Sequence, residues 1–180
     1  PRELSYLVGK HREMYLHDMK LCQEFAKINR RTIQSIICYY MCWEVTKETE
    51  RFQTIHNYIE YDTNIVRKGA ISAKTGEKVL IPINMRDGCI LGIGKGNEDW
   101  NYSAPHGAGR TMSRSKAKES ILLEEYQKAM DGIFTTSVNT STIDESPMAY
   151  KTMDEIIGNI KDTVEIVDII KPIYNFKANE

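Results

Sequence analysis

A single histidine stands at the edge of a glycine-rich loop and is followed by two arginines. The segment HGAGR covers residues 106–110, and Arg114 follows it. Glycines let backbone N–H groups approach an oxyanion closely, and arginines add fixed positive charge. A histidine beside such a cradle could bind phosphate, transfer a proton, or act as a nucleophile that forms a phosphoramidate. A plain glycine turn explains the glycines but not the histidine together with both arginines, so the segment predicts a phosphate site.

Two residues elsewhere could take part in similar chemistry. His56 lies in the mostly apolar segment TIHNYIEYD, where a buried core histidine is the ordinary explanation and a metal ligand is the alternative. A metal ion needs several ligands, and only Asp62 and Asp87 are nearby carboxylates with any claim. Lys177 follows the last predicted strand, where a lysine is ordinarily solvated. The residues alone leave the roles of His56 and Lys177 open.

The elements that must position these residues follow from hydrophobic periodicity. Apolar residues recur at steps of three and four between Ser5 and Trp43, which predicts one long helix or two joined helices. Between Phe52 and Leu91, short runs rich in isoleucine and valine predict strands. The turn KTGEK between the second and third strands suits a hairpin, since Gly76 can adopt a positive φ. The four predicted strands are TIHNYIEYD, NIVRKGAISA, KVLIPIN and CILGIG.

The second half of the chain is expected to alternate helices and connectors. A helix over residues 113–130 should begin at an N-cap of Ser113 or Ser115. A polar connector and a short helix in AYKTMDEIIGNI follow, and TVEIVDIIKPIYNFK reads as a closing strand that ends at Pro172 or passes through it at a sheet edge. The expected fold class is α+β, with a mixed or antiparallel sheet, a long N-terminal helical segment and packed helices.

Composition limits the classes of function. The chain has 180 residues, of which 41% are hydrophobic and 27% charged, which suits a globular core. The formal net charge of −1 shows no general basic excess, so any binding of nucleic acid must use a local patch. The four cysteines match no zinc signature, and no apolar run reaches the roughly 18 residues that span a membrane. We expect reduced thiols and a cytoplasmic protein without a membrane partner.

Several motifs, taken in order, resemble those of the RtcB family of RNA-splicing ligases. They are HNYIEYD, RKGAISA, VLIPINM, SAPHGAGRTMSR, ESPMAYK and PIYNFKA, and together they extend over nearly the whole chain. The resemblance implies an RNA ligase that depends on GTP and manganese (Mn²⁺). Such an enzyme joins an RNA 3′-phosphate, or a 2′,3′-cyclic phosphate opened first by hydrolysis, to a 5′-hydroxyl. It also implies that residues 1–180 are a single unit, the C-terminal half of a larger RtcB-like fold, helical over 1–45 and nucleotide-binding over 52–180.

The resemblance assigns roles by motif. His106 would be the nucleophile that attacks the α-phosphorus of GTP and forms a guanylyl-histidine, from which GMP passes to the RNA 3′-phosphate before the 5′-hydroxyl expels it. His56 would bind manganese, Lys177 would donate to the guanine edge, and Arg110 and Arg114 would meet phosphate. The other expected nucleotide contacts are Asn57, Pro82, Ile83, Asn84, Met85, Cys89, Gly107, Ala108, Gly109 and Tyr150.

This sequence departs from the family pattern in two ways. It has PINM and Cys89 where the family commonly has PGSM and a serine, and a thiol is a poor substitute for a hydroxyl as a hydrogen-bonding group. In addition, most of the family's metal ligands belong to an N-terminal half that the chain lacks. We therefore expect the chain to be inactive alone and to need that half as a partner. RNA, as tRNA halves or broken ends, and an activating protein are the other expected partners.

Two alternatives to a ligase remain at this point. The first is a binding module that keeps the fold and the phosphate loop but no longer ligates RNA. The second is a hydrolase that uses the same histidine and differs only in the acceptor. The combination of HGAGR with His56 and Lys177 favours a ligase, since these residues have no shared packing reason to occur together.

Overall fold

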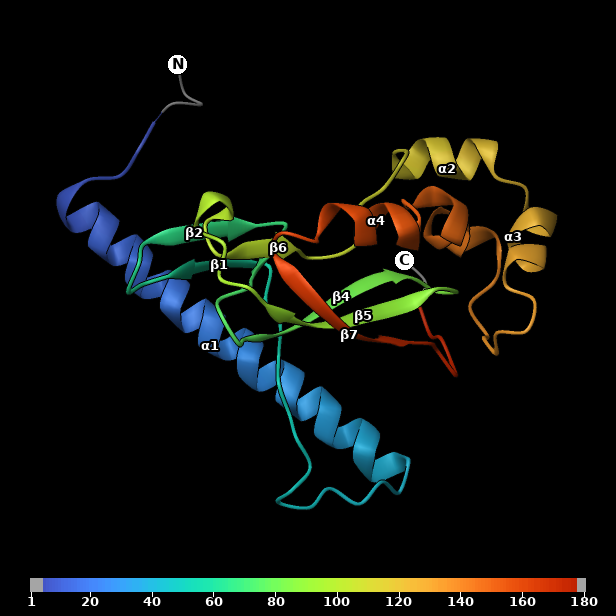
Figure 1. Ribbon diagram of the computed structural model, residues 1–180, viewed down its shortest axis with the longest axis horizontal. Helices are drawn as coiled ribbons and strands as arrows, with labels where there is room; N and C mark the ends of the chain where they lie inside the picture. Colours follow the sequence, from blue (N-terminus) through green and yellow to red (C-terminus); the bar gives the residue numbers. More distant parts are fainter. Residues whose placement is uncertain (1–4, 178–180) are drawn as a thin grey trace. The chain divides into compact units, whose positions relative to one another are not determined.

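The computed structural model describes residues 5–177 and has the predicted α+β fold (Figure 1). The chain divides into two compact units. One comprises Pro1–Gln53 with Tyr58–Val66, and the other comprises Thr54–Asn57 with Arg67–Glu180. The expectation of a single unit over 1–180 stays a prediction.

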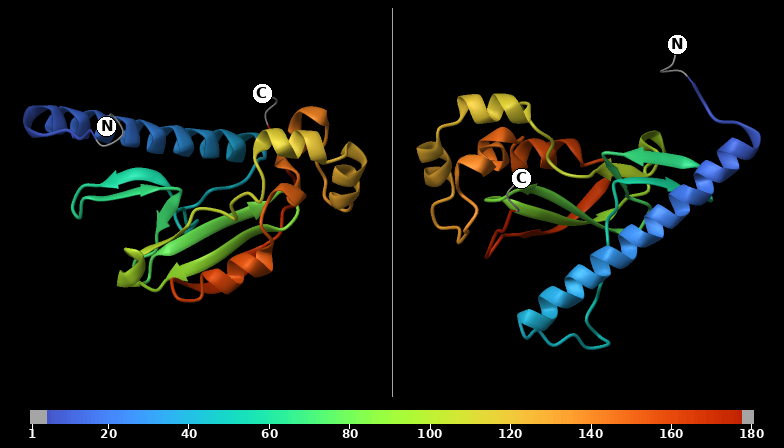
Figure 2. Two further views of the ribbon diagram at one scale, coloured as in Figure 1. Left: turned by 90° about the horizontal axis from the view of Figure 1, so that it is seen from above. Right: turned by 180° about the vertical axis from the view of Figure 1, so that it is seen from behind.

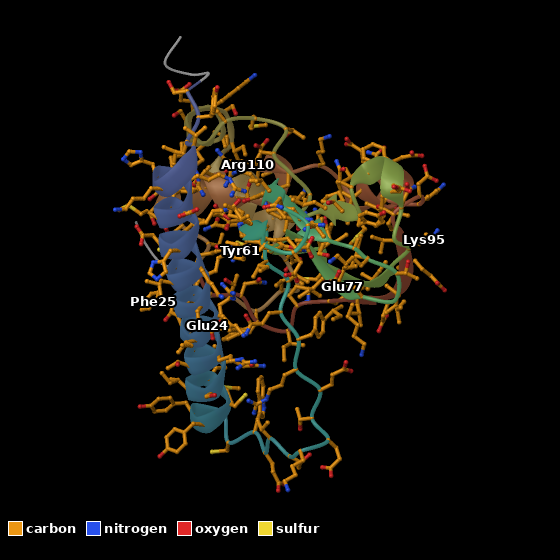
Figure 3. All side chains as sticks on the ribbon, turned by 90° about the vertical axis from the view of Figure 1, so that its left-hand side faces the viewer. Glu24, Phe25, Tyr61, Glu77, Lys95 and Arg110 are labelled. Atoms are coloured by element: carbon orange, nitrogen blue, oxygen red, sulfur yellow. The ribbon has the colours of Figure 1, made fainter. Side chains whose placement is uncertain are left out.

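The first unit is built on α1 (Gly9–Tyr40), one continuous helix of 32 residues where a long helix or two joined helices are predicted. No residue of α1 is buried. The side chain of Gln23 bonds both the N–H and the carbonyl of Ile59, at 2.8 and 3.3 Å. The Tyr61 hydroxyl donates to the carbonyl of Leu16 at 3.2 Å, and Phe25 projects from α1 into solvent (Figure 3). Polar contacts, rather than a buried core, therefore hold residues 58–61 on α1.

The second unit contains an antiparallel sheet in the order β4-β5-β7, formed by β4 (Lys78–Asn84), β5 (Gly88–Gly94) and β7 (Val164–Ile170). Buried and more exposed residues alternate along β4, as the period of two requires. Figure 2 shows α4 (Met153–Asn159) against one face of this sheet. The core there comprises Ile71, Ala73, Val79, Ile81, Ile83, Ile90, Ala104, Ala108, Ile156, Ile160 and Val164.

Short strands complete the β structure. β1 (Asn57–Glu60) pairs with β2 (Ile65–Lys68), and β3 (Ala70–Ser72) pairs antiparallel with β6 (Ser103–Pro105). The prediction of one strand over NIVRKGAISA is wrong, because Gly69 adopts φ +70° and divides it into β2 and β3. β6 was not predicted, since three residues are too few for a period-two signal.

The turn after β3 has the predicted backbone but a different function. Gly76 adopts φ +79°, as the turn chemistry of KTGEK predicts. The strands on its two sides nevertheless pair elsewhere, since β3 pairs with β6 and β4 with β5. The predicted hairpin is therefore wrong, and the turn carries the chain from one sheet to the other.

A second core lies among the short helices. α2 (Arg114–Ser120) begins at Ser113, whose hydroxyl accepts from Lys116 N as an N-cap, as predicted. The prediction of one helix over 113–130 is wrong, because Ile121 and Leu122 have extended backbone and α3 (Leu123–Ala129) starts anew. The Ser120 hydroxyl bonds the Lys116 carbonyl and so competes with the helix ladder. This core contains Met85, Ala117, Ile121, Tyr126, Met130, Ile143 and Ala149.

The connector before the last helix contains two short 3-10 helices, η3 (Thr140–Glu145) and η4 (Pro147–Ala149); a third, η2 (Glu98–Trp100), precedes β6. β7 ends at Ile170, so the strand stops before Pro172 and does not run through it. The chain then returns to the connector, where Thr135 and Asn175 form a β-bridge. Within residues 5–177, no helix is both long and apolar enough to span a membrane.

Candidate active site

A cavity of about 1030 Å³ in the second unit gathers residues that are widely separated in sequence. Every residue with a predicted site role lines it except Asn57. Six further residues that sequence analysis did not select also line it: Gly88, Ser141, Thr142, Asp144, Glu145 and Asn175. The residues of predicted function are His56, Pro82, Ile83, Asn84, Met85, Cys89, His106, Gly107, Ala108, Gly109, Arg110, Arg114, Tyr150 and Lys177.

The imidazole of His106 is exposed in this cavity and is oriented by a backbone carbonyl. Its Nδ1 atom lies 2.7 Å from the carbonyl oxygen of Gly69. A carbonyl can only accept a hydrogen bond, so Nδ1 carries the proton and the neutral ring has its lone pair on Nε2. The Gly69 N–H in turn donates to the His56 carbonyl at 2.8 Å and to Asn57 Oδ1 at 3.2 Å. Asn57 therefore reaches His106 through Gly69 and does not line the cavity.

His56 lies beside the candidate nucleophile. The rings of His56 and His106 are stacked, with centroids 4.9 Å apart and planes inclined by 19°. His56 is exposed and immediately precedes β1, so the alternative of a buried core histidine is wrong. Among residues 5–177, no group of three or more His, Cys, Asp or Glu side chains is placed to hold a metal ion. The described residues therefore do not form a manganese site around His56.

The glycine loop is fixed against β4 and η4. Ala108 is buried, and its N–H donates to the Pro82 carbonyl at 3.1 Å. A Cβ added at Gly107 would lie 3.0 Å from that same carbonyl oxygen, so only glycine fits there without a shift of the backbone. At the far end, the Lys151 N–H donates to the Gly109 carbonyl at 3.1 Å. The loop is exposed to the cavity but is held by main-chain bonds on both sides.

The turn between β4 and β5 explains the roles of Asn84 and Asp87. Asn84 Oδ1 accepts from the N–H groups of Arg86 and Asp87 at 3.0 and 2.8 Å, and its amide donates to the Asp87 carboxylate at 2.8 Å. The hydrogen bond from Arg86 holds the pKa of Asp87 below its ordinary value. Asn84 therefore shapes the cavity wall by closing the turn, and Asp87 is engaged with Arg86 rather than with His56.

Cys89 lies on this wall as a neutral thiol. The side chain is half-buried, and burial raises the pKa of the thiol. At neutral pH it is therefore a weak donor and acceptor rather than a thiolate.

Two adjacent carboxylates, Asp144 and Glu145, organise the cationic side of the cavity. The Arg110 guanidinium lies 2.7 Å from Glu145 Oε1 and 4.7 Å above the centroid of the Tyr150 ring (Figure 3 labels Arg110). Arg114 lies 2.7 Å from Asp144, whose side chain is only 4% exposed. Neither carboxylate is predicted from the sequence, because both lie in a polar connector with no periodic signal. An acidic pair after twelve uncharged residues (132–143) is the one signal that would have selected them.

Comparisons with known proteins agree with the motifs. The family model described as "tRNA-splicing ligase RtcB" matches residues 1–178. The chain is similar to the RNA-splicing ligase RtcB of Escherichia coli K12, with 31% identity over 98% of this chain and 47% of the relative. It is also similar to RNA-splicing ligase RtcB1 of E. coli ATCC 25922, with 30% identity over the same shares. The tRNA-splicing ligase RtcB of Aeropyrum pernix is 41% identical over 45% of this chain and 18% of the relative. The chain thus spans about half the length of the two E. coli relatives.

Proposed function

The chain belongs to the RtcB family of tRNA-splicing ligases, and on that premise we propose that it carries the nucleophile and the nucleotide pocket of a GTP-dependent RNA ligase. The observation that carries this proposal is the hydrogen bond between His106 Nδ1 and the Gly69 carbonyl. It selects the tautomer in which Nε2 is unprotonated, which is the state that a nucleophilic imidazole needs.

The proposed reaction has three steps. His106 Nε2 attacks the α-phosphorus of GTP, so that an N–P bond forms and the P–O bond to pyrophosphate breaks. An oxygen of the RNA 3′-phosphate then takes the guanylyl group, which breaks the N–P bond and frees His106. The RNA 5′-hydroxyl finally attacks the activated 3′-phosphate, loses its proton and expels GMP. Pyrophosphate and GMP are both good leaving groups, whereas without activation an oxygen of the RNA 3′-phosphate would have to leave unaided.

The cavity supports this assignment by its size and its charges. Its volume is at the upper end of the range of about 300–1000 Å³ typical of small-molecule sites, which leaves room for a nucleotide and an RNA end. Lys177 and Tyr150 would hold the guanine. Arg110 and Arg114 would bind a phosphate group of the nucleotide or of RNA beside the glycine loop.

We propose that most of the manganese ligands come from polypeptide outside these 180 residues. His56 is the one residue with a predicted metal role, and the described residues supply no further ligands around it. We propose that an N-terminal half of the same ligase completes the site. RNA substrates, an activating protein and a cytoplasmic location belong to the same proposal. What this chain supplies to the step at His106 is the tautomer of the imidazole and its access to the cavity.

A non-ligating module is the second candidate. The lack of a metal-binding cluster within residues 5–177 favours it. Such a module would bind GTP without transferring the guanylyl group, which separates it clearly from a ligase. A hydrolase would form the same histidine adduct but would pass it to water.

The test is reaction of the full-length protein with GTP labelled at the α-phosphorus, in the presence of manganese. A phosphoramidate is labile in acid and stable in alkali, so bound label should be lost in acid and retained in alkali. The variant His106→Ala should take up no label. His17→Ala, which removes an exposed histidine of α1, is the matched control and should behave as the wild type. Label that survives acid, or that persists in His106→Ala, would overturn the role of His106.

A further inference from the structure

Glu145 links the segments that make up the cationic side of the cavity. The residue ends η3, and its carboxylate is 17% exposed. It accepts from Arg110 Nη2 at 2.7 Å, from the Tyr150 hydroxyl at 2.9 Å, and from Lys177 Nζ at 3.2 Å. These three donors come from the glycine loop, from the end of η4 and from the C-terminal segment, and Arg114 Nη1, at the start of α2, also lies 3.2 Å from Glu145 Oε1. Arg110 and Tyr150 are also joined by a β-bridge, and the Glu145 carboxylate adds Lys177 of the C-terminal segment to this pair.

The charge on Glu145 is stabilised by the groups it orients. Burial alone would raise the pKa of Glu145, but the hydrogen bond from Tyr150 and the charges of Lys177 and Arg110 outweigh it and leave the pKa below its ordinary value. Because the ionised carboxylate can only accept, Tyr150 must donate to it. The Tyr150 oxygen then accepts from Arg110 Nη2 at 2.9 Å. The direction of every hydrogen bond in this set is thereby fixed.

The main chain near Lys177 is held separately from its side chain. The Lys177 N–H donates to Ser137 Oγ at 2.8 Å, and the Asn175 amide donates to the Met85 carbonyl at 2.6 Å. Neither contact involves Glu145. Removing the charge of Glu145 should therefore release the ammonium group of Lys177 without releasing the segment that carries it.

We propose that Glu145 is a positioning residue of the nucleotide pocket, which holds the Lys177 ammonium and the Tyr150 hydroxyl where the guanine base enters. The proposal rests on the proposed function and adds to it the residue through which the guanine contacts are set. Asp144 has a different position, since it is buried and its carboxylate lies 2.7 Å from Arg114, 3.6 Å from Lys118 and 3.8 Å from Arg110. Both carboxylates therefore contact the two arginines, and Glu145 is the one of the pair that contacts Lys177 and Tyr150.

The test is single-turnover guanylylation of the full-length protein over a range of GTP concentrations. Glu145→Gln keeps the shape and an acceptor for Tyr150 but removes the charge. It should raise the half-saturating GTP concentration by about tenfold, as expected for losing a charged hydrogen bond, with the maximal rate changed by less than about threefold. Glu145→Asp keeps the charge and should raise that concentration by only about threefold. Glu155→Gln, which removes an exposed carboxylate paired with Lys151 on α4, is the matched control and should change nothing.

A double-mutant cycle separates positioning from general structural damage. If Glu145 acts through Lys177, Glu145→Gln should have a much smaller effect in a Lys177→Met background than in the wild type. An unchanged half-saturating concentration in Glu145→Gln, or an equal effect in both backgrounds, would overturn the proposal. Should Glu145→Gln not fold, as judged by thermal unfolding, an unchanged value in Glu145→Asp would overturn it instead. Absence of labelling in the wild type, or labelling in His106→Ala, would refute the proposed function and not this inference.

Discussion

The imidazole of His106 donates from Nδ1 to the carbonyl of Gly69, 2.7 Å away, and that carbonyl belongs to a residue whose N–H is held by Asn57. The chain therefore orients its candidate nucleophile through the backbone of a glycine at the junction of β2 and β3. Asn57 does not line the cavity, but through Gly69 it can influence the orientation of the His106 ring.

Removing the Asn57 side chain tests this route. Asn57→Ala takes one acceptor from the Gly69 N–H and should lower the maximal rate of guanylylation by about tenfold, the order expected for one hydrogen bond at a reacting group. The half-saturating GTP concentration should stay the same, because Asn57 does not line the cavity. Asn159→Ala, at the end of α4, is the control. A higher half-saturating concentration with an unchanged rate would instead support a direct contact between Asn57 and the nucleotide.

The fit of the glycine loop against β4 predicts a steric effect at Gly107. The new Cβ of Gly107→Ala would lie 3.0 Å from the Pro82 carbonyl oxygen, so the loop must move and guanylylation should fall by at least about tenfold. Gly158→Ala is the contrast, since nothing lies within 4 Å of a Cβ at that helical position. That variant should keep its activity and gain about 0.5–1 kcal/mol in the free energy of unfolding. Equal activity of the two variants would contradict the close fit of the loop.

The ionisation of Glu145 predicts how stability depends on pH. Its pKa in the folded protein lies below 4.5, the ordinary value of a glutamate, so its ion pairs stabilise the fold above that value and are lost as the pH falls through the folded pKa. Below about pH 4.5, the free energy of unfolding should therefore decline less steeply with falling pH in Glu145→Gln than in the wild type. Urea denaturation between pH 3.5 and 7 measures this difference. Parallel curves would show that the carboxylate titrates alike in the folded and unfolded states.

The thiol at position 89 predicts a gain of nucleotide affinity on replacement. Cys89→Ser places a stronger hydrogen-bonding group on the cavity wall, and the half-saturating GTP concentration should fall by about threefold. Cys22→Ser, at an exposed cysteine of α1, controls for the loss of a thiol elsewhere. A rise in the half-saturating concentration would show that the cavity prefers the larger, less polar sulfur atom.

The sequence predicted the elements whose signals are local. The periodicity of α1, the alternation in β4 and the Ser113 cap depend on neighbouring residues and are confirmed. The break between α2 and α3 was missed because burial of Ile121 overrides a continuous helical pattern. Pairing of β3 with β6 was missed for a similar reason, as partners 30 or more residues apart leave no periodic signal.

The motifs predicted the residues that line the site. They did not predict the residues that hold those side chains in place. All but one of the selected residues line one cavity, yet Gly69 and Glu145 contribute through contacts between distant segments. The Gly69 carbonyl selects the tautomer of His106, but every residue has a carbonyl, so the residue type gives no signal of this role. Glu145 likewise has no distinguishing spacing, since its partners lie on separate parts of the chain.

The proposed function depends most on a covalent bond between Nε2 of His106 and the guanylyl group. The most direct measurement is peptide mapping by mass spectrometry after the full-length protein has reacted with GTP and manganese, with samples kept in alkali. We expect a single GMP adduct on the peptide that contains residue 106, absent from His106→Ala. An adduct on a lysine, or on any peptide without His106, would contradict it.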